Sequence, residues 1–463
     1  MSHQNRYHVI KDPVHGTMQF TDIEDKWVKP FINSPHFQRL RHIKQLGMGD
    51  YIFPGSVHTR FNHSIGCCYV GRQVGHKIGL ADEERQLTMI ACLLHDLGHG
   101  PFSHTFEDLF QQKLIRHEDW TPFFLADYRS EIFFEDYNRH NPRYTLTEAK
   151  FSQVEAMIMH KPMAKRVLAD IVSSQLDADR LDYLLRDSHF CGVAYGHYDF
   201  PWLLHCLAIV DSGQGERLGI TYKGIGAVEH YLMARRLMIR NIYYSYKKLA
   251  LEYLLVRLLS QLASVIDQAP YAELKKTRLG ILLDRVNAFN LALAGTTVSK
   301  TLKQDFLRDC YPLYKELCDY DVLALIKQLA EGNDDSIITA IAKRLHHRQI
   351  PKIVGLDGVD MVELETRIRE FKVKNKIRIE DWQLAVIKTP HQSYTAEGDP
   401  ILVLNEYGQA KPLDEISLMI HAISDKYEQA GFLCIDRAIM ADKSVEALVK
   451  SISAQGLKAG IVL

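Results

Sequence analysis

Histidines and aspartates are concentrated in three short stretches of the sequence. TRFNHSIG contains His63, LLHDLGHG contains His95 and Asp96, and SSQLDADRLDYLLRD contains Asp179. Two imidazoles and two carboxylates make a mixed nitrogen and oxygen ligand set for one divalent ion, which could be Mn, Fe, Ni, Co, Zn or Mg. The absence of thiolates in this set argues against a structural zinc. Each residue alone is more often hydrogen-bonded or solvated, since the chain has 22 histidines, so the prediction rests on the joint pattern.

A second pattern lies directly after the last of these stretches. Asp179, Tyr183 and Asp187 are spaced i, i+4 and i+8, which places them on one face of a helix. Leu181 and Leu184 lie on another face. A solvated polar face is the alternative, but such a face usually carries Lys and Glu, so the pattern favours the wall of a pocket.

Three arginines could bind phosphate. Arg60 precedes His63, Arg180 follows Asp179, and Arg235 lies on a later helix. A guanidinium binds phosphate oxygens in pairs, although each arginine alone is more often part of a surface ion pair. The sequence has no GxxxxGK[ST] or GxGxxG motif, so a glycine-rich loop does not hold the phosphate.

The ends of the helix that carries His95 can be predicted from the residues that cap and stop it. Asp82 is its predicted N-cap, and the acidic residues that follow it suit a first turn. The buried face is predicted from Leu87, Ile90, Ala91 and Leu94. His95 continues this stripe and should therefore point inward. Gly98, Gly100 and Pro101 are expected to stop the helix.

The remaining pattern predicts a mainly α protein. With 463 residues, 46% of them hydrophobic, the chain is long enough for two or three domains. Helical periodicity dominates up to about residue 345, and short β-rich segments bounded by turn residues follow. We expect a core over 1–265, a helical extension over 266–349 and a smaller α+β domain over 350–463.

Composition excludes several classes of protein. The net charge of −1 predicts no general attraction to nucleic acid or membranes. The eight cysteines form no disulfide or zinc-finger pattern. No signal peptide and no apolar run of ~18 residues is present, so a cytoplasmic protein is expected. KVKNKIRIED is predicted to be a strand with one basic face (Lys372, Lys374, Lys376 and Arg378), which is more typical of a solvated edge than of a phosphate or nucleic-acid site.

Four motifs follow one another along the chain in the order RFNH, HDLGHGPFSH, HE and DADRLDYLLRD. This order resembles that of the HD-domain phosphohydrolases, and most closely that of their dNTP triphosphohydrolase branch. The resemblance covers about residues 7–260. It implies a helical HD core, to which the β-rich pattern after residue 350 adds the smaller C-terminal α+β appendage. It also implies that the metal ligands are His63, His95, Asp96 and Asp179.

Further site residues are implied by position in the same motifs. The residues implied in acid–base catalysis and phosphate contact are His99, His104, His117 and Glu118. Among them, His104 and His117 are the candidates for protonating the leaving oxygen. Those for substrate binding are Gln45, Leu46, Arg60, Arg180, Tyr183, Asp187, Arg235 and Tyr243. Tyr183 would lie under the sugar and leave no room for a 2′-hydroxyl, while Asp187 would bind the 3′-hydroxyl.

The implied reaction is metal-dependent hydrolysis of a deoxynucleoside triphosphate to deoxynucleoside and inorganic triphosphate. The implied partners are a nucleotide substrate, a nucleotide effector and further copies of the chain in a dimer or tetramer. Asn33 replaces an aspartate that reads guanine in the family, which argues against a GTP-specific effector. Two alternatives remain open. One is phosphohydrolysis of a nucleoside monophosphate or an alarmone, and the other is nucleotide sensing or nucleic-acid binding with a vestigial site.

Overall fold

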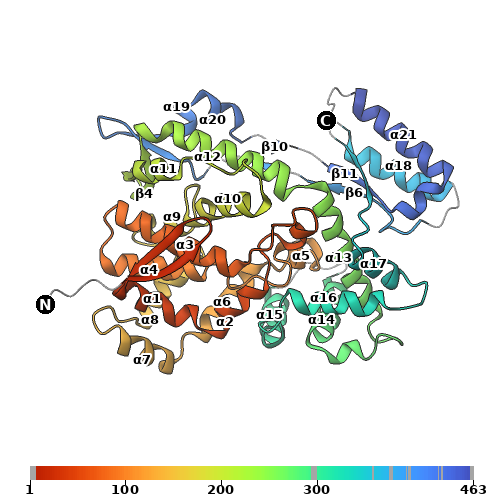
Figure 1. Ribbon diagram of the computed structural model, residues 1–463, viewed down its shortest axis with the longest axis horizontal. Coiled ribbons are helices and arrows are strands. Elements are labelled where there is room, and N and C mark those ends of the chain that lie inside the picture. The colour runs from red at the N-terminus through yellow and green to blue at the C-terminus, as the bar shows by residue number, and fades with distance from the viewer. Residues whose placement is uncertain are drawn as a thin grey trace.

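The computed structural model describes residues 7–293, 300–356, 359–374, 379–389, 391–392, 394, 398–425, 427–428 and 431–458. The fold is mainly α-helical with a sheet-containing C-terminal region, as the sequence predicts (Figure 1). The strands within 7–21 and 207–221 were not predicted. One apolar core extends from Met18 to Ile420, and a separate, smaller cluster lies among the C-terminal elements.

The chain begins with an antiparallel hairpin, β1 (Tyr7–Asp12) and β2 (Gly16–Thr21). Asp12 closes its turn, because one carboxylate oxygen accepts the backbone N–H groups of Val14 and His15, each at 2.9 Å. Gly16 has a φ of +68°, which a residue with a Cβ adopts at a cost. Two helices follow, α1 (Asp22–Ile32) and α2 (Pro35–Arg39).

Five helices form the centre of the N-terminal half: α3 (Arg60–Lys77), α4 (Asp82–Leu94), α8 (Glu148–Ile158), α9 (Arg166–Val172) and α10 (Ala178–Cys191). α3 packs against both α4 and α10. Asn62 supports the start of α3, since its side-chain oxygen accepts the Thr59 backbone N–H at 3.2 Å. The predicted apolar stripe of α4 is buried.

Two details of α4 differ from the prediction. Its N-cap is Ala81, whose N–H is accepted by the Glu84 carboxylate at 3.3 Å, and Asp82 is the first helical residue. The helix ends at Leu94, before Gly98. Gly98 has another role, because a Cβ there would lie 2.2 Å from the carbonyl oxygen of His117.

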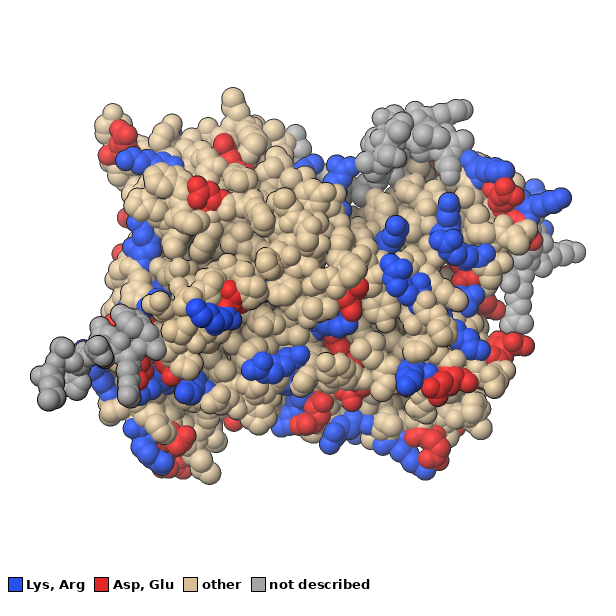
Figure 2. Space-filling model, viewed as in Figure 1, with Lys and Arg blue, Asp and Glu red and all other residues tan. Residues whose placement is uncertain are grey.

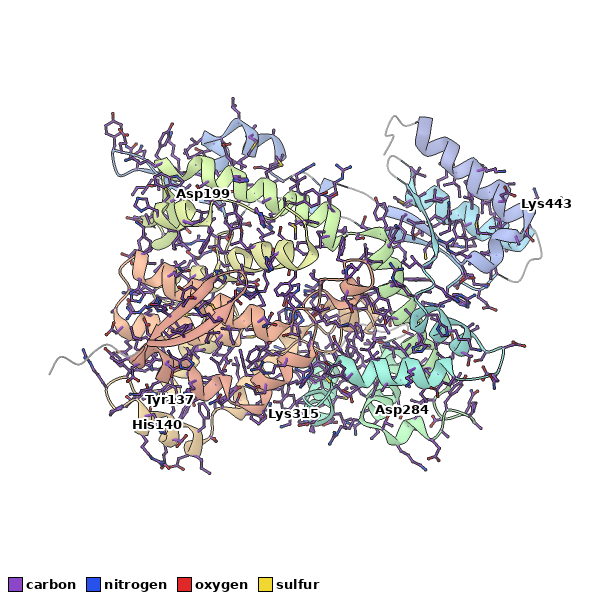
Figure 3. All side chains as sticks on the ribbon, viewed as in Figure 1. Tyr137, His140, Asp199, Asp284, Lys315 and Lys443 are labelled. Carbon is purple, nitrogen blue, oxygen red and sulfur yellow. The ribbon has the colours of Figure 1, made fainter. Side chains whose placement is uncertain are left out.

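The other helices up to residue 346 surround this centre. They are α5 (His104–Glu107), α6 (His117–Asp127), α7 (Glu131–His140), α11 (Phe200–Cys206), α12 (Ile225–Met238), α13 (Tyr246–Val265), α14 (Arg278–Leu293), α15 (Lys300–Tyr314), α16 (Asp319–Ala330) and α17 (Ile337–His346). Lys315, labelled in Figure 3, follows α15 and binds Asp127 at the end of α6 at 3.0 Å. The segment predicted as a helical extension therefore packs directly on the core.

The C-terminal region divides between two places (Figure 1). β5 (Lys352–Gly355), β11 (Gly431–Ile435) and β6 (Leu384–Lys388) form one sheet in that order, beside α18 (Met361–Lys374) and α21 (Lys443–Lys458). The short pair β7 (His391–Gln392) and β10 (Tyr427–Glu428) lies between this sheet and the second place.

At that second place the late strands extend a sheet of the core. β8 (Leu402–Leu404) runs parallel to β4 (Glu216–Thr221), in the order β3-β4-β8-β9 with β3 (Leu207–Asp211) and β9 (Ala410–Pro412). The following α19 (Leu413–Ile416) and α20 (Leu418–Ile423) lie beside α12 (Figure 1). Residues after 350 thus do not all belong to one separate body, and the three-domain division stays a prediction.

The predicted basic strand is wrong where the structure describes it. Lys372 and Lys374 lie in the last turn of α18, while Lys376 and Arg378 fall outside the described residues. Leu364 and Ile368 are buried at helical i, i+4 spacing, so helical periodicity outweighs the alternation of the lysines. Figure 2 shows basic and acidic side chains interspersed on the visible face. None of the helices within the described ranges is long and apolar enough to cross a membrane.

Candidate metal centre and active-site cavity

The four predicted metal ligands converge from three helices. His63 lies on α3, His95 and Asp96 follow the end of α4, and Asp179 is in the first turn of α10. Asp179 Oδ1 lies 2.9 Å from His63 Nε2 and 3.5 Å from His95 Nε2. Asp96 Oδ2 lies 3.7 Å from His63 Nε2, and its other oxygen lies 3.4 Å from His95 Nε2.

His95 provides a direct test of whether these residues fit a cation. Its Nδ1 lies 2.8 Å from the carbonyl oxygen of Cys92, and this hydrogen bond fixes the ring. Its Nε2 is buried and has no hydrogen-bond partner among the described residues, although two carboxylates lie 3.4 and 3.5 Å away. A buried nitrogen facing two anions is unfavourable unless a positive charge lies between them. The donor set therefore fits a divalent ion.

His63 leads to the same conclusion. Burial alone would lower its pKa, but hydrogen bonds to Asp179 and Asp182 outweigh that effect and raise the pKa to about 10. The protonated His63 ring lies between two carboxylates, so this position stabilises a positive charge. Metal binding at such a site releases protons.

Cys67 lies close to the predicted ligands. Its sulfur is 3.4 Å from both ring nitrogens of His63, and its position one helical turn after His63 is the only sequence signal for it. Burial raises the pKa of this thiol well above its usual value, and Asp182 and Asp179 raise it further. The sulfur lies with atoms of His63, His95 and Asp179 in a group that could hold a metal ion, so Cys67 is a further candidate ligand that the predicted set did not include.

A cavity of about 620 Å³ opens beside this cluster, a size typical of small-molecule sites. Most of the predicted site residues border it: Gln45, Leu46, Arg60, His95, Asp96, His99, His104, His117, Glu118, Asp179, Tyr183, Asp187 and Tyr243. His63 is fully buried beneath them. Lys113 and Lys248 also border the cavity, and the sequence motifs do not mark either of them.

The three predicted phosphate-binding arginines differ in position. Arg60 borders the cavity, where Nη1 donates to Asp96 at 2.6 Å and Nε donates to Ser103 at 2.9 Å. Arg180 and Arg235 do not border it. Arg180 binds Asp177 and a backbone carbonyl, and Arg235 donates to the Gln175 side chain at 2.9 Å. Their contact with phosphate stays a prediction.

His99, His104 and His117 form a second cluster, in which Glu107 joins His104 to His117. The sequence motifs did not reveal Glu107. Glu107 Oε1 lies 3.1 Å from His104 Nδ1 and 2.7 Å from His117 Nδ1. These hydrogen bonds orient both rings and leave their Nε2 atoms available. Burial would raise the pKa of Glu107, but the two histidines outweigh it and hold that pKa far below its usual value.

Two observations favour proton transfer over metal binding in this second cluster. The His99 and His117 rings are stacked at 3.7 Å and 15°, so their in-plane lone pairs run nearly parallel instead of converging on one ion. Burial, and then Arg60, lower the pKa of His99 well below its usual value, so His99 is neutral. Glu118 is more peripheral, with its carboxylate 3.5 Å from His117 Nδ1 and its side chain half exposed.

The helix face predicted from Asp179, Tyr183 and Asp187 borders the cavity, while Leu181 and Leu184 are buried behind it. Asp187 is oriented by two neighbours. His58 Nε2 lies 2.7 Å from its Oδ1, and the Tyr243 hydroxyl donates to its Oδ2 at 2.8 Å. The Tyr243 ring meets the Tyr183 ring edge-on at 5.9 Å. Two aromatic rings beside a fixed carboxylate suit recognition of a flat ring and a hydroxyl.

The loop from His99 to His104 is held by a distant helix. Phe102 and Ser103 both have positive φ values, of 55° and 56°, which non-glycine residues adopt at a cost. The Phe102 backbone N–H donates to Asp319 of α16 at 2.6 Å, and the Lys44 N–H donates to the other oxygen of Asp319 at 2.9 Å. Asp319 thus fixes the loop that carries two of the catalytic candidates.

We expect Asp319→Ala to destabilise the protein by roughly 2–5 kcal/mol, because two buried N–H donors lose their acceptor. Burial raises the pKa of Asp319 to about 6, although the Phe102 and Lys44 N–H groups oppose the shift. Because this pKa lies above that of the unfolded chain, about 4, the stability from Asp319 is full at low pH and is lost as the pH rises from about 4 to 6.

Thermal unfolding of the wild type, Asp319→Asn and Asp319→Ala between pH 4 and 7 tests this prediction. Asp319→Asn should remove the part of the pH dependence of the melting temperature that this carboxyl causes. Asp321→Ala on the same helix removes an exposed cap to the Cys318 N–H and is the control. An unchanged melting temperature in Asp319→Ala would contradict the role of this residue.

The chain matches one family and is similar to several known proteins. Residues 60–187 match the family described as HD domain. The chain is 28% identical to the uncharacterized protein YwfO of Bacillus subtilis, with 96% of this chain and 95% of the relative covered. It is 30% identical to human deoxynucleoside triphosphate triphosphohydrolase SAMHD1 over 52% of this chain and 42% of that protein. A phosphohydrolase structure from Bacteroides thetaiotaomicron has a TM-score of 0.73 at 26% identity, with 93% of this chain and all of that chain covered.

Proposed function

We propose that this chain, which is an HD-domain phosphohydrolase, hydrolyses deoxynucleoside triphosphates to deoxynucleoside and inorganic triphosphate. One observation carries the proposal. A single cavity is bordered by the metal cluster, by the histidine cluster around Glu107, and by Tyr183, Asp187 and Tyr243. The similarity to SAMHD1 supports the same substrate class.

The roles of the residues follow from this arrangement. His63, His95, Asp96 and Asp179 would hold one divalent ion, which supplies Lewis-acid polarisation of a phosphoryl oxygen and activation of water. Arg60 and Lys113 provide positive charge on the cavity wall for the triphosphate. Along the helix axis Asp187 lies about 12 Å from Asp179, which leaves room for the sugar beyond the phosphates.

Bond changes in the reaction balance with water alone. A water oxygen bonds to the α-phosphorus, the bond from phosphorus to the 5′-oxygen breaks, and that oxygen takes a proton. His104 and His117 are the candidate donors, because Glu107 binds their Nδ1 atoms and leaves their Nε2 atoms available. Tyr183 would exclude a 2′-hydroxyl, and Asp187 would accept a hydrogen bond from the 3′-hydroxyl.

Other properties belong to the same proposal. We expect a cytoplasmic homo-oligomer, either dimer or tetramer, that responds to a nucleotide effector. Gln38, Arg41 and Arg348 are the candidate effector contacts, and the Gln38 side chain accepts a hydrogen bond from Arg41 at 2.7 Å. Nucleic acid and membranes are not expected partners.

Product analysis tests the proposal. The protein is loaded separately with Mn, Fe, Ni, Co, Zn and Mg and incubated with each dNTP, each NTP and a deoxynucleoside monophosphate, and the products are resolved by anion exchange. Intact triphosphate together with deoxynucleoside, formed from dNTPs in preference to NTPs, is the expected result. Release of orthophosphate from the monophosphate alone would favour the alternative substrate class, and no turnover with any metal would contradict the proposal.

A further inference from the structure

Asp182 is a fully buried carboxylate directly behind the metal cluster. Its Oδ2 accepts hydrogen bonds from His63 Nδ1 and Arg186 Nε, both at 2.8 Å. Its Oδ1 accepts from His15 Nε2 at 2.6 Å and Arg186 Nη2 at 2.9 Å. Four hydrogen bonds on one carboxylate leave it no freedom to rotate. Because His63 Nδ1 is bound here, His63 Nε2 faces Asp179 and Asp96.

The N-terminal hairpin completes this arrangement, although it lies outside residues 60–187, which match the HD domain. His15 reaches Asp182 from the hairpin turn, and Asp12 in the same turn accepts a hydrogen bond from Arg186 Nη1 at 2.8 Å. The His15 ring is buried beside Tyr69 and Phe200, at 5.9 and 6.2 Å. The hairpin therefore contacts both the fixed carboxylate of Asp182 and its partner Arg186.

Gly66 shows how tightly the network is packed against α3. A Cβ at this position would lie 2.0 Å from Asp182 Oδ1 and 2.4 Å from Arg186 Nη2. Only a residue without a side chain allows the carboxylate and the guanidinium to lie against the helix that carries His63. The helix backbone and the network thus occupy fixed positions relative to each other.

Asp182 is paired with a cation, because the Arg186 guanidinium donates one hydrogen bond to each of its oxygens. An ionised carboxylate that accepts the second N–H of a metal-binding histidine fixes the ring and raises its basicity, and changes to such groups weaken metal binding about 10- to 100-fold.

We infer that Asp182 is a positioning residue for the metal ligand His63 and that the N-terminal hairpin, through His15, is a working part of the metal centre. The inference rests on the metal site in the proposed function but not on the identity of the substrate. Metal affinity should therefore depend on residues of the hairpin that do not contact the ion.

Calorimetric titration of the metal-free full-length protein with Mn²⁺ tests this inference. Asp182→Asn should weaken Mn²⁺ binding about 10- to 100-fold, and His15→Phe, which keeps an aromatic ring but removes the donor, should weaken it by a smaller factor. His15→Gln retains an N–H donor and should restore part of the affinity. His36→Phe is the matched control, because His36 also lies between aromatic rings and binds a carboxylate, Asp127, at 2.9 Å, away from the metal cluster.

Melting temperatures of the metal-free variants separate a folding defect from a defect in positioning. If Asp182→Asn does not fold, the inference is tested by comparing the Mn²⁺ affinity of His15→Phe with the affinities of His15→Gln and His36→Phe. Wild-type affinity in His15→Phe, or an equal loss in His36→Phe, would overturn the inference. Failure of the wild type to bind Mn²⁺ would instead contradict the metal site itself, and failure to hydrolyse dNTPs would leave the affinity comparison valid.

Discussion

Asp179→Ala is expected to lose the bound metal and the hydrolytic activity together. Asp179 Oδ1 lies 2.9 Å from His63 Nε2 and 3.5 Å from His95 Nε2, so it lies at the centre of the cluster. Removing it leaves two buried imidazoles without their shared carboxylate. The fall in kcat/KM should exceed the ~100-fold typical of changes outside the ligand set. Metal content by elemental analysis and turnover of dNTP measure the two effects.

A matched control lies on the same helix. Asp187→Ala removes a carboxylate two turns away that binds His58 and Tyr243 instead of the metal cluster. It should retain metal while its KM for dNTP rises. Retention of full activity by Asp179→Ala would show that the ligand assignment is wrong, and loss of metal by Asp187→Ala would show that the two ends of the cavity are not independent.

His117→Ala is expected to lower kcat by about 10²–10⁴-fold with the metal retained, as for loss of a general acid. His117 Nδ1 lies 2.7 Å from Glu107, which stays ionised, and its ring borders the cavity. His104 binds the same oxygen at 3.1 Å but is 65% exposed. The less exposed ring is better fixed, so His117→Ala should have the larger effect of the two.

The choice of leaving group isolates proton donation from binding. With p-nitrophenyl triphosphate the departing nitrophenolate needs no proton, so His117→Ala should hydrolyse this ester nearly as well as the wild type. An equal loss with dNTP and with the nitrophenyl ester would show that His117 contacts the phosphates instead of donating a proton. Glu107→Gln should reproduce part of the loss with dNTP, because both rings lose their orienting carboxylate.

The sequence was sufficient for the helical class, for the inward direction of His95 and for the shared face of Asp179, Tyr183 and Asp187. Each depends on local periodicity, since a helix fixes which residues share a face whatever it packs against. The combination of histidines and aspartates also predicted a mixed nitrogen and oxygen ligand set, and the structure brings these residues together. In the basic stretch, alternation of charges was weaker than the helical spacing of Leu364 and Ile368, and the strand prediction there was wrong.

Contacts between distant segments could be found only in the tertiary structure. Glu107 joins His104 and His117, Asp319 holds the loop before them, and the hairpin reaches Asp182 across more than 160 residues of sequence. The pairing of β8 with β4 likewise returns the late chain to the core. Local patterns carry no information about such contacts, because their energy comes from burial and hydrogen bonding between segments that meet only after folding. The sequence therefore determined the kind of centre, and the tertiary structure decided which residues orient it.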